Sequence, residues 1–151
     1  MVDLRKHEPT PLTVFVDADA FVALAREDDT NHTLALAVLA RFTTQPTTLI
    51  TSNYVFAECV TVISQRIDHA AALAFINTIK TPQSVFTMHR ITEELEDAAL
   101  RLFSEQTSKN VSFVDCTNMA IVTQRRIDYI FSFDQVYRKN GYRLVEELLE
   151  Q

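Results

Sequence analysis

A short apolar run that ends at two aspartates constrains the fold of this chain more than any other stretch. Within Leu12 to Phe21, sequence LTVFVDADAF, residues 14–16 are apolar without alternation, which is typical of a strand buried on both faces. Asp17 and Asp19 follow at the point where that strand leaves the core. In an open α/β sheet, ligands bind just outside the carboxyl ends of the strands. The stretch therefore predicts such a sheet, with a carboxylate at its ligand-binding edge.

Helical and strand patterns alternate along the rest of the chain. Helices are expected over 18–26 and 32–42, from a cap at Ser52 or Asn53 to Gln65, from Asp68 to Pro82, from Thr92 to about Thr107, and from Ser112 to Arg125. Further strands are expected around residues 49–50 and over 85–88, 128–133 and 142–145. Strands separated by helices imply right-handed crossovers. The pattern predicts an α/β fold with a mainly parallel sheet of about five strands and helices on both faces.

Length and composition limit the chain to one domain. A chain of 151 residues with 47% hydrophobic content suits a single core, which we expect over residues 12–151 after a polar, proline-interrupted tail at 1–11. No stretch of 18 or more apolar residues is present, and the first dozen residues do not resemble a signal peptide. Cys59 and Cys116 lie in apolar helical patterns without metal-ligand spacing. We therefore expect a cytoplasmic protein with reduced core cysteines and no membrane association.

Charge and glycine content exclude some functions. The net charge of −6 argues against binding nucleic acid by a basic surface alone. It is compatible with a nuclease, because clustered carboxylates attract phosphate once a divalent metal is bound. The single glycine, Gly141, excludes phosphate-cradling loops of the GxGxxG or P-loop kind.

Four acidic residues are expected at one edge of the sheet. Asp17 and Asp134 end strands, Asp115 opens a helix, and Glu58 lies in the second turn of a helix that follows a strand. Each has a structural alternative. Asp17 and Asp134 suit turns, and Asp115 is the last residue of a capping box that begins at Ser112.

Glu58 is the most informative of the four acids. It falls on the apolar stripe of its helix, where an unpaired carboxylate costs several kcal/mol. The alternative is an ion pair with an arginine of another helix. Like charges about 4 Å apart repel by about 4 kcal/mol per pair at an effective dielectric near 20, so convergence of the acids requires protons or cations. Oxygen ligands without His or Cys favour Mg²⁺ or Mn²⁺ over zinc.

The surroundings of these acids resemble those of the PIN-domain ribonucleases, especially VapC-type toxins of toxin-antitoxin pairs. The matching stretches are VFVDADAFVAL around Asp17, NYVFAECVTVI around Glu58, VSFVDCTNMAI around Asp115 and YIFSFDQVYRKNGY around Asp134. Each motif is short, but four in order at suitable spacing are fairly specific, and together they span nearly the whole chain.

The resemblance implies a three-layer α/β/α sandwich, an acidic pocket that binds one or two Mg²⁺ or Mn²⁺ ions, and endonucleolytic cleavage of RNA. Asp17, Glu58, Asp115 and Asp134 would take the four catalytic and metal-binding roles. Two residues after the first acid the family usually has Ser, Thr or Asn, whereas this chain has Asp19, which would add a ligand or change metal affinity. The positions that often support the site are, in this sequence, Asn118 and Ser132.

RNA and protein partners need further surfaces. The first candidates for phosphate contacts are the basic residues grouped in the last quarter of the chain: Arg125, Arg126, Arg138, Lys139 and Arg143. They also suit an ordinary solvated face. The predicted helix at 32–42 is apolar nearly all round, so it is either deeply buried or covered by a partner. A homodimer and an antitoxin protein are the partners that we expect.

Two other functions remain open from the sequence. Asp17 and Asp19 have the D-x-D spacing of haloacid-dehalogenase-like phosphatases, but Phe21 stands where those enzymes have Thr or Val, and no lysine has a convincing context. A PIN-like module without catalytic activity is the other alternative, although it would have no reason to keep Glu58 on an apolar face.

Overall fold

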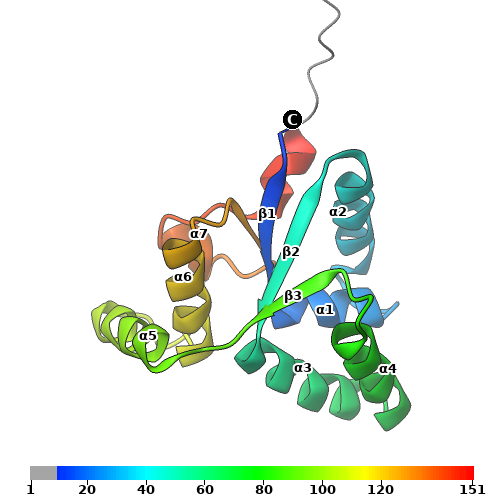
Figure 1. Cartoon of the computed structure of the whole chain (residues 1–151), viewed down its shortest axis with the longest axis horizontal. Helices are drawn as coiled ribbons and strands as arrows, with labels where there is room; N and C mark the ends of the chain where they lie inside the picture. Colours follow the sequence, from blue (N-terminus) through cyan, green and yellow to red (C-terminus); the bar gives the residue numbers. More distant parts are fainter. Residues whose placement is uncertain (1–9) are drawn as a thin grey trace, which may run out of the picture.

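The computed structural model describes residues 10–151, so most of the tail predicted at 1–11 lies outside the described residues. One sheet of four parallel strands organises the chain, in the order β3-β2-β1-β4 (Figure 1). The strands are β1 (Leu12–Val16), β2 (Thr47–Ser52), β3 (Phe86–His89) and β4 (Tyr129–Phe131). Val14 pairs with Leu49 on one side and with Tyr129 on the other, so β1 is central and buried as predicted.

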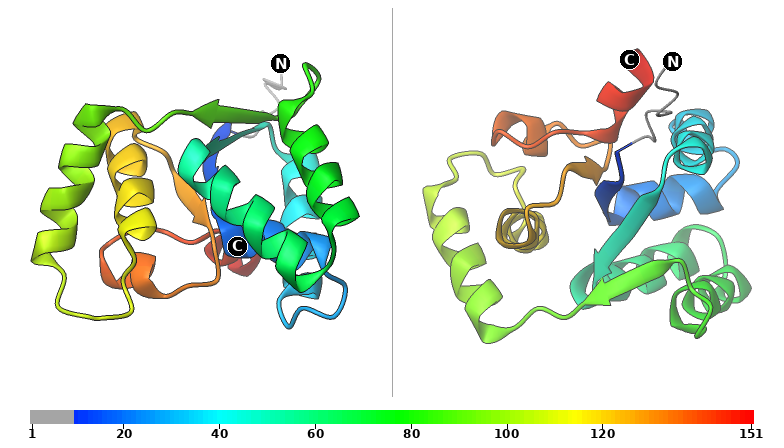
Figure 2. Two further views of the ribbon diagram at one scale, coloured as in Figure 1. Left: turned by 90° about the horizontal axis from the view of Figure 1, so that it is seen from below. Right: turned by 45° about the horizontal axis from the view of Figure 1, so that its top comes forward.

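Helices cover both faces of the sheet, which confirms the three-layer α/β/α sandwich. The helices are α1 (Ala18–Ala25), α2 (His32–Thr44), α3 (Asn53–Arg66), α4 (His69–Lys80), α5 (Glu93–Glu105), α6 (Phe113–Arg125) and α7 (Val136–Lys139), followed by a 3-10 helix, η1 (Val145–Glu150). In Figure 1, α5, α6 and α7 lie to the left of the sheet and α2 and α4 to its right, and the views of Figure 2 show the same separation.

Short polar side chains begin the helices next to the carboxyl ends of the strands. The side chains of Asp17, Ser52, Thr92 and Ser112 each accept a hydrogen bond from a backbone N–H in the first turn of α1, α3, α5 and α6, respectively. Ser52 is the last residue of β2, and Asp17 directly follows the neighbouring strand β1. Local capping chemistry therefore fixes where the chain turns at the edge that carries the candidate site.

The predicted fifth strand at 142–145 is wrong. Only Leu144 forms an isolated parallel bridge, with Ile130, and the chain then winds into η1. The reason is the spacing of Leu144, Val145 and Leu148, which are all buried and repeat as in a helical turn, while Glu146 and Glu147 face basic partners. The polar loop predicted around 138–141 includes the end of the one-turn helix α7, and Gly141, with φ +86°, follows it.

Two further expectations change in detail. The fourth strand is shorter than 128–133, because the side chain of Asp128 accepts hydrogen bonds from Thr13 and because Phe133 N–H turns to Asp19. Helix α2 buries only Ala35 and Val38, and Leu36 is 48% exposed, so this helix is not deeply buried.

Two remaining expectations can be compared with residues 10–151. Cys59 and Cys116 are free and buried, as predicted. Within that range, no helix combines the length and the apolar character that a membrane crossing requires.

Candidate active site

Asp17 is buried at the end of β1 and is held by three donors. Its Oδ1 accepts hydrogen bonds from Ala18 N at 2.7 Å and from Asn118 Nδ2 at 3.1 Å. Its Oδ2 accepts one from the Tyr137 hydroxyl at 2.5 Å. Burial raises the pKa of Asp17 to about 8, and the charge of Asp19 adds to the rise, while the bonds from Tyr137 and Ala18 oppose it. Asp17 is thus a fixed carboxyl group in a setting that disfavours its charge.

Asp115 uses its two oxygens for two different purposes. Its Oδ2 accepts from Ser112 N at 2.9 Å, and its N–H donates to Ser112 Oγ at 3.0 Å, which completes the predicted capping box of α6. Its Oδ1 accepts from the Tyr137 hydroxyl at 3.2 Å. Partial burial raises the pKa of Asp115, against the bonds from Ser112. The capping role and a role in the site are therefore compatible, because they occupy different oxygens.

Asp19 lies between Asp17 and the end of β4. Its Oδ2 accepts hydrogen bonds from Ser132 Oγ at 2.9 Å and from Phe133 N at 2.7 Å. Its Oδ1 is buried and has no hydrogen-bond partner among residues 10–151. Burial raises the pKa of Asp19, and the charge of Asp134 adds to the effect. An unpartnered buried carboxylate oxygen is costly, so this atom is a natural ligand position for a cation.

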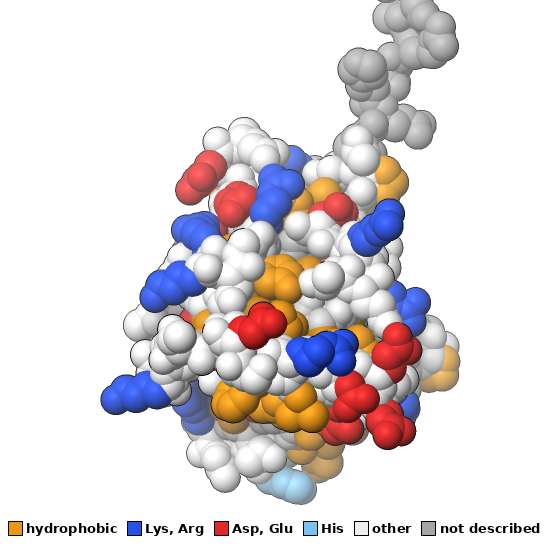
Figure 3. All heavy atoms as spheres, turned by 90° about the vertical axis from the view of Figure 1, so that its left-hand side faces the viewer, with side chains coloured by type: hydrophobic (Ala, Val, Ile, Leu, Met, Phe, Trp, Pro, Cys, Tyr) orange, Lys and Arg blue, Asp and Glu red, His pale blue; other side chains and the backbone are white. Residues whose placement is uncertain are grey.

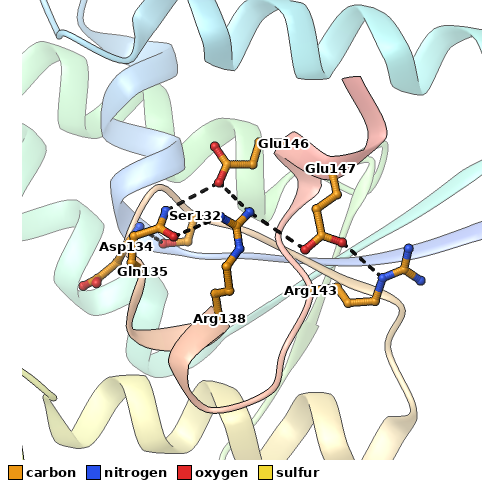
Figure 4. A network of polar contacts seen from close by, with 7 residues as sticks. All are labelled: Ser132, Asp134, Gln135, Arg138, Arg143, Glu146 and Glu147. Carbon is orange, nitrogen blue, oxygen red and sulfur yellow. Dashed lines mark hydrogen bonds and ion pairs between the residues drawn. The ribbon is translucent and has the colours of Figure 1, made fainter. Parts of the chain in front are cut away.

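Asp134 begins the turn into α7. Its Oδ1 accepts from Val136 N at 3.0 Å, and its N–H donates to Ser132 Oγ at 3.1 Å, so it forms the local turn that its residue type favours. The side chain is exposed. Ser132 therefore connects Asp19 and Asp134, and Figure 4 shows Asp134 pointing away from the ion pairs of Arg138.

Glu58 is exposed, which corrects the expectation that it lies on a buried apolar face. The next residue, Cys59, takes the buried position on α3. Glu58 and Asp19 line one cavity of about 290 Å³, together with Arg66. Partial desolvation and the charges of Asp115 and Asp19 raise the pKa of Glu58. The alternative ion pair with an arginine is not found for Glu58 in the described part of the chain.

The acid cluster, defined as Asp17, Asp19, Glu58, Asp115 and Asp134, consists of groups that act on one another electrostatically. The charge of Asp115 acts on Asp17 and Glu58, and the charge of Asp134 acts on Asp19 and Asp115. Between residues 10 and 151, however, no three acidic, His or Cys side chains lie close enough to hold one ion together. The structure brings the acids to one edge, and Asp17 and Asp115 both contact the Tyr137 hydroxyl.

The donor set fits a hard divalent cation. Mg²⁺ usually keeps several waters and is held by one or two carboxylates rather than by a cage of protein ligands. Asp17 and Asp115 share one hydroxyl contact, and the buried Oδ1 atoms of Asp19 and Asn118 have no hydrogen-bond partner within residues 10–151. All these atoms are oxygens, which suits Mg²⁺ or Mn²⁺.

Most of the predicted basic residues of the last quarter do not contact the acid cluster in the described residues. Arg138 pairs with Glu146 at 2.7 Å, and Arg143 pairs with Glu147 at 3.3 Å (Figure 4). Arg143 also lies over the Tyr129 ring. Arg125 is the last residue of α6 and Arg126 caps its end, about 15 Å along the helix axis from the acidic first turn. Lys139 lines a cavity of about 400 Å³ that also includes Asp134.

Two polar residues near the acids were missed by sequence reasoning. Tyr137 is fully buried in α7, and burial and the charge of Asp17 raise its pKa well above its ordinary value. Arg66 lies on the same face of α3 as Glu58, eight residues later. The only signal for Arg66 was this helical spacing. Tyr137 falls within the motif around Asp134, but nothing in that motif indicated a hydroxyl directed at carboxylates.

Comparison with known proteins identifies the class to which this fold and its acid cluster belong. The family described as PIN domain matches residues 14–141, which include all five acids of the cluster. The chain therefore belongs to the PIN-domain family, as the four motifs indicated.

A VapC protein is among its relatives. The chain is 29% identical over 129 residues to the 23S rRNA-specific endonuclease VapC20 of Mycobacterium tuberculosis, a match that covers 85% of this chain and 95% of that protein. The crystal structure of that VapC20, described as a sarcin-ricin loop cleaving toxin, matches with a TM-score of 0.77 and 27% identity, again over 85% and 95% of the two chains. VapBC2 from Rickettsia felis, crystallised with a DNA fragment from its promoter, matches with a TM-score of 0.60 at 12% identity over 88% of this chain and 97% of that one, which shows a shared fold.

Proposed function

We propose that this chain is an endoribonuclease that hydrolyses RNA phosphodiester bonds at the acid cluster with Mg²⁺ or Mn²⁺, and that it is the toxin of a type II toxin-antitoxin pair. The observation that carries the proposal is the meeting of Asp17 and Asp115 at one hydroxyl, beside three further acids at the carboxyl edge of the sheet. The similarity to a 23S rRNA-specific endonuclease supports the choice of RNA.

Asp17, Asp115, Asp19 and Glu58 would hold one or two ions, and Asp134 would support them. Divalent ions in such sites activate water, orient the phosphate and stabilise charge on the leaving oxygen. The protein supplies the positions of the oxygens. Asp17 is oriented by three donors, and Asp19 is held by Ser132 and the backbone of Phe133. Hydrolysis by activated water requires no side-chain nucleophile and leaves a 5′-phosphate and a 3′-hydroxyl.

RNA must approach a negatively charged edge, so a nearby cation is needed. The face formed by α5, α6 and α7 carries interspersed acidic and basic side chains rather than a continuous basic surface (Figure 3). Arg138 and Arg143 are engaged by Glu146 and Glu147. Arg66 shares a cavity with Asp19 and Glu58 and is exposed, so it is the first candidate for a phosphate contact.

Cleavage assays with purified protein test the proposal. The substrates are an RNA hairpin with the sarcin-ricin loop sequence and an unstructured RNA of the same length, with Mg²⁺ or with a chelator. Asp115→Asn should lower the rate at least about 100-fold, because losing about 3 kcal/mol of charge stabilisation has that effect. Asp97→Asn on exposed α5 is the matched control and should retain the wild-type rate. Equal rates for both variants, or products that end in a cyclic phosphate, would contradict the mechanism.

An antitoxin and a second copy of the chain are the protein partners that we propose. Exposed apolar side chains support this, among them Leu100 and Phe103 on α5 and Leu36 on α2. A cavity of about 400 Å³ is lined by other residues of α5, among them Ala98 and Leu102, and by residues of α6. Expression of the chain alone should arrest growth, expression with Asp115→Asn should not, and a neighbouring antitoxin gene should relieve the arrest. Arrest by the wild type and the variant alike would contradict a toxin that acts by cleavage.

A further inference from the structure

The hydroxyl of Tyr137 lies where two carboxylates of the acid cluster meet. It is 2.5 Å from Asp17 Oδ2 and 3.2 Å from Asp115 Oδ1. Asn118 Nδ2 donates to the same hydroxyl oxygen at 2.9 Å. The tyrosine is 0% exposed, so these protein groups replace water around the hydroxyl. One atom of α7 therefore contacts the end of β1 and the first turn of α6, which are far apart in the sequence.

The amide of Asn118 determines where the tyrosine proton points. Its Nδ2 donates to Asp17 Oδ1 at 3.1 Å and to the Tyr137 oxygen at 2.9 Å, which accounts for both N–H groups. The tyrosine oxygen thus accepts from Asn118, and its single O–H is left to donate to the carboxylates. The hydroxyl has one proton and two acidic neighbours, so it is shared between Asp17 and Asp115.

We infer that Tyr137 is a positioning residue whose hydroxyl holds the carboxylates of Asp17 and Asp115 together, so that both are in place to bind a divalent cation. The inference rests on the proposed function, because it assigns Tyr137 a role toward the ion of that site. When both groups are ionised, as cation binding requires, they repel each other, and without the shared donor they move apart. Mg²⁺ demands near-ideal octahedral geometry, so displaced ligands bind it more weakly.

The sequence around Tyr137 makes the arrangement rigid. Asp134 Oδ1 accepts from Val136 N and so fixes the start of α7, directly before the tyrosine. Tyr142 N–H donates to the backbone oxygen of Tyr137 at 3.0 Å. The tyrosine is held by its backbone as well as by its hydroxyl, so loss of the hydroxyl alone should leave the ring in place.

Tyr137→Phe tests the inference, with Tyr142→Phe as the matched control. The Tyr142 hydroxyl also contacts α6, through Thr123 Oγ1 at 2.8 Å and Met119 O at 3.3 Å, but no contact joins it to the acid cluster in the described residues. Mg²⁺ affinity is measured calorimetrically without RNA, and cleavage of the sarcin-ricin hairpin is measured at limiting and saturating Mg²⁺. Tyr137→Phe should weaken Mg²⁺ binding about 10-fold or more, the usual effect of losing a partner of a metal ligand. Tyr142→Phe should leave it unchanged.

The outcomes separate the inference from the proposed function. At saturating Mg²⁺ the kcat of Tyr137→Phe should return to within about threefold of wild type, because the hydroxyl positions ligands and does not react. If the wild type binds Mg²⁺ and Tyr137→Phe binds it with the same affinity, the inference is overturned and the proposed function is not. Absence of Mg²⁺ binding and of cleavage in the wild type overturns both.

A measurement on the unaltered chain covers the case in which Tyr137→Phe does not fold. The protein has four tyrosines, whose Cζ carbons can be labelled with ¹³C and followed by NMR during a Mg²⁺ titration. If the inference holds, Mg²⁺ binding shifts the signal of Tyr137. The spectrum of Tyr142→Phe identifies the signal of Tyr142, so the shifted signal must still be present in that variant. Mg²⁺ binding that moves none of the tyrosine signals overturns it.

Discussion

Replacing Asp17 by asparagine should stabilise the metal-free protein, although it removes a central group of the site. The pKa of Asp17 is about 8 in the folded chain and 3.8 in an unfolded one. Between these values the unfolded state has released a proton that the folded state retains, so stability falls as the pH rises through this window. Below about pH 4 the group is protonated in both states and has no effect. Asparagine does not titrate and therefore avoids the loss.

The size of the effect follows from the width of the window. A pKa unit corresponds to about 1.4 kcal/mol, so a rise of about four units amounts to about 6 kcal/mol above pH 8 and about 4 kcal/mol at pH 7. The new amide can accept from Ala18 N–H as a helix cap, but it no longer accepts from Tyr137, at a cost of about 1 kcal/mol. We expect a net gain of about 3 kcal/mol at pH 7 and a net loss of up to about 1 kcal/mol near pH 4, where only the lost bond from Tyr137 counts.

Urea unfolding in EDTA, followed by circular dichroism from about pH 4 to about pH 8, measures this difference. Asp68→Asn is the matched control, because Asp68 also begins a helix, accepting from Ala71 N at 2.7 Å, but is exposed. The control should change stability by less than about 0.5 kcal/mol. Addition of Mg²⁺ at about 100 times its Kd should stabilise the wild type by about 2.7 kcal/mol and Asp17→Asn far less. A variant that is less stable than wild type at pH 8 would refute the reasoning.

Three further predictions concern single residues. Ser112→Ala and Thr92→Ala each remove a helix cap, so each should lower the free energy of unfolding in urea by about 1 kcal/mol. Only Ser112→Ala should also slow RNA cleavage, because Ser112 is bonded to Asp115 of the acid cluster. Arg66→Gln should raise the KM for RNA several-fold and make that KM less dependent on salt, whereas Arg41→Gln on α2 should change neither. A KM for Arg66→Gln equal to that of the wild type would exclude the phosphate contact of Arg66. Glu58→Gln should weaken Mg²⁺ binding in calorimetry with little change in urea stability, because Glu58 is exposed, and unchanged Mg²⁺ affinity would remove it from the ligand set.

Local patterns predicted most of the fold and the placement of the acids. The end of β1 at Asp17 and the capping box at Ser112 depend on a few adjacent residues, so the sequence specifies them directly. The meeting of Asp19 with Ser132 followed from a topological rule, because the carboxyl ends of the parallel strands β1 and β4 share an edge, whereas Asp115 is brought to that edge by α6.

The errors arose where long-range contacts compete with local pattern. Residues 142–145 have strand-like composition, but the segment has only one bridging partner, Ile130, and its buried side chains favour a helical turn. Glu58 has apolar neighbours in sequence, yet Cys59 takes the buried position and Glu58 faces a cavity. The hydroxyl of Tyr137 could not be placed, because its partners lie 22 and 120 residues away.

The donors that surround the acid cluster orient its carboxyl groups without supplying a positive charge. The groups that hold these acids are neutral: Ala18 N, Ser112 N and Oγ, Asn118 Nδ2, Ser132 Oγ, Phe133 N, Val136 N and the Tyr137 hydroxyl. Neutral donors orient carboxylates without cancelling their charge, whereas an arginine would do both. Arg138 and Arg143 are instead engaged by Glu146 and Glu147 of η1 (Figure 4). The segment that replaces the expected fifth strand thus pairs two nearby cations, and within residues 10–151 no lysine or arginine forms an ion pair with the acid cluster.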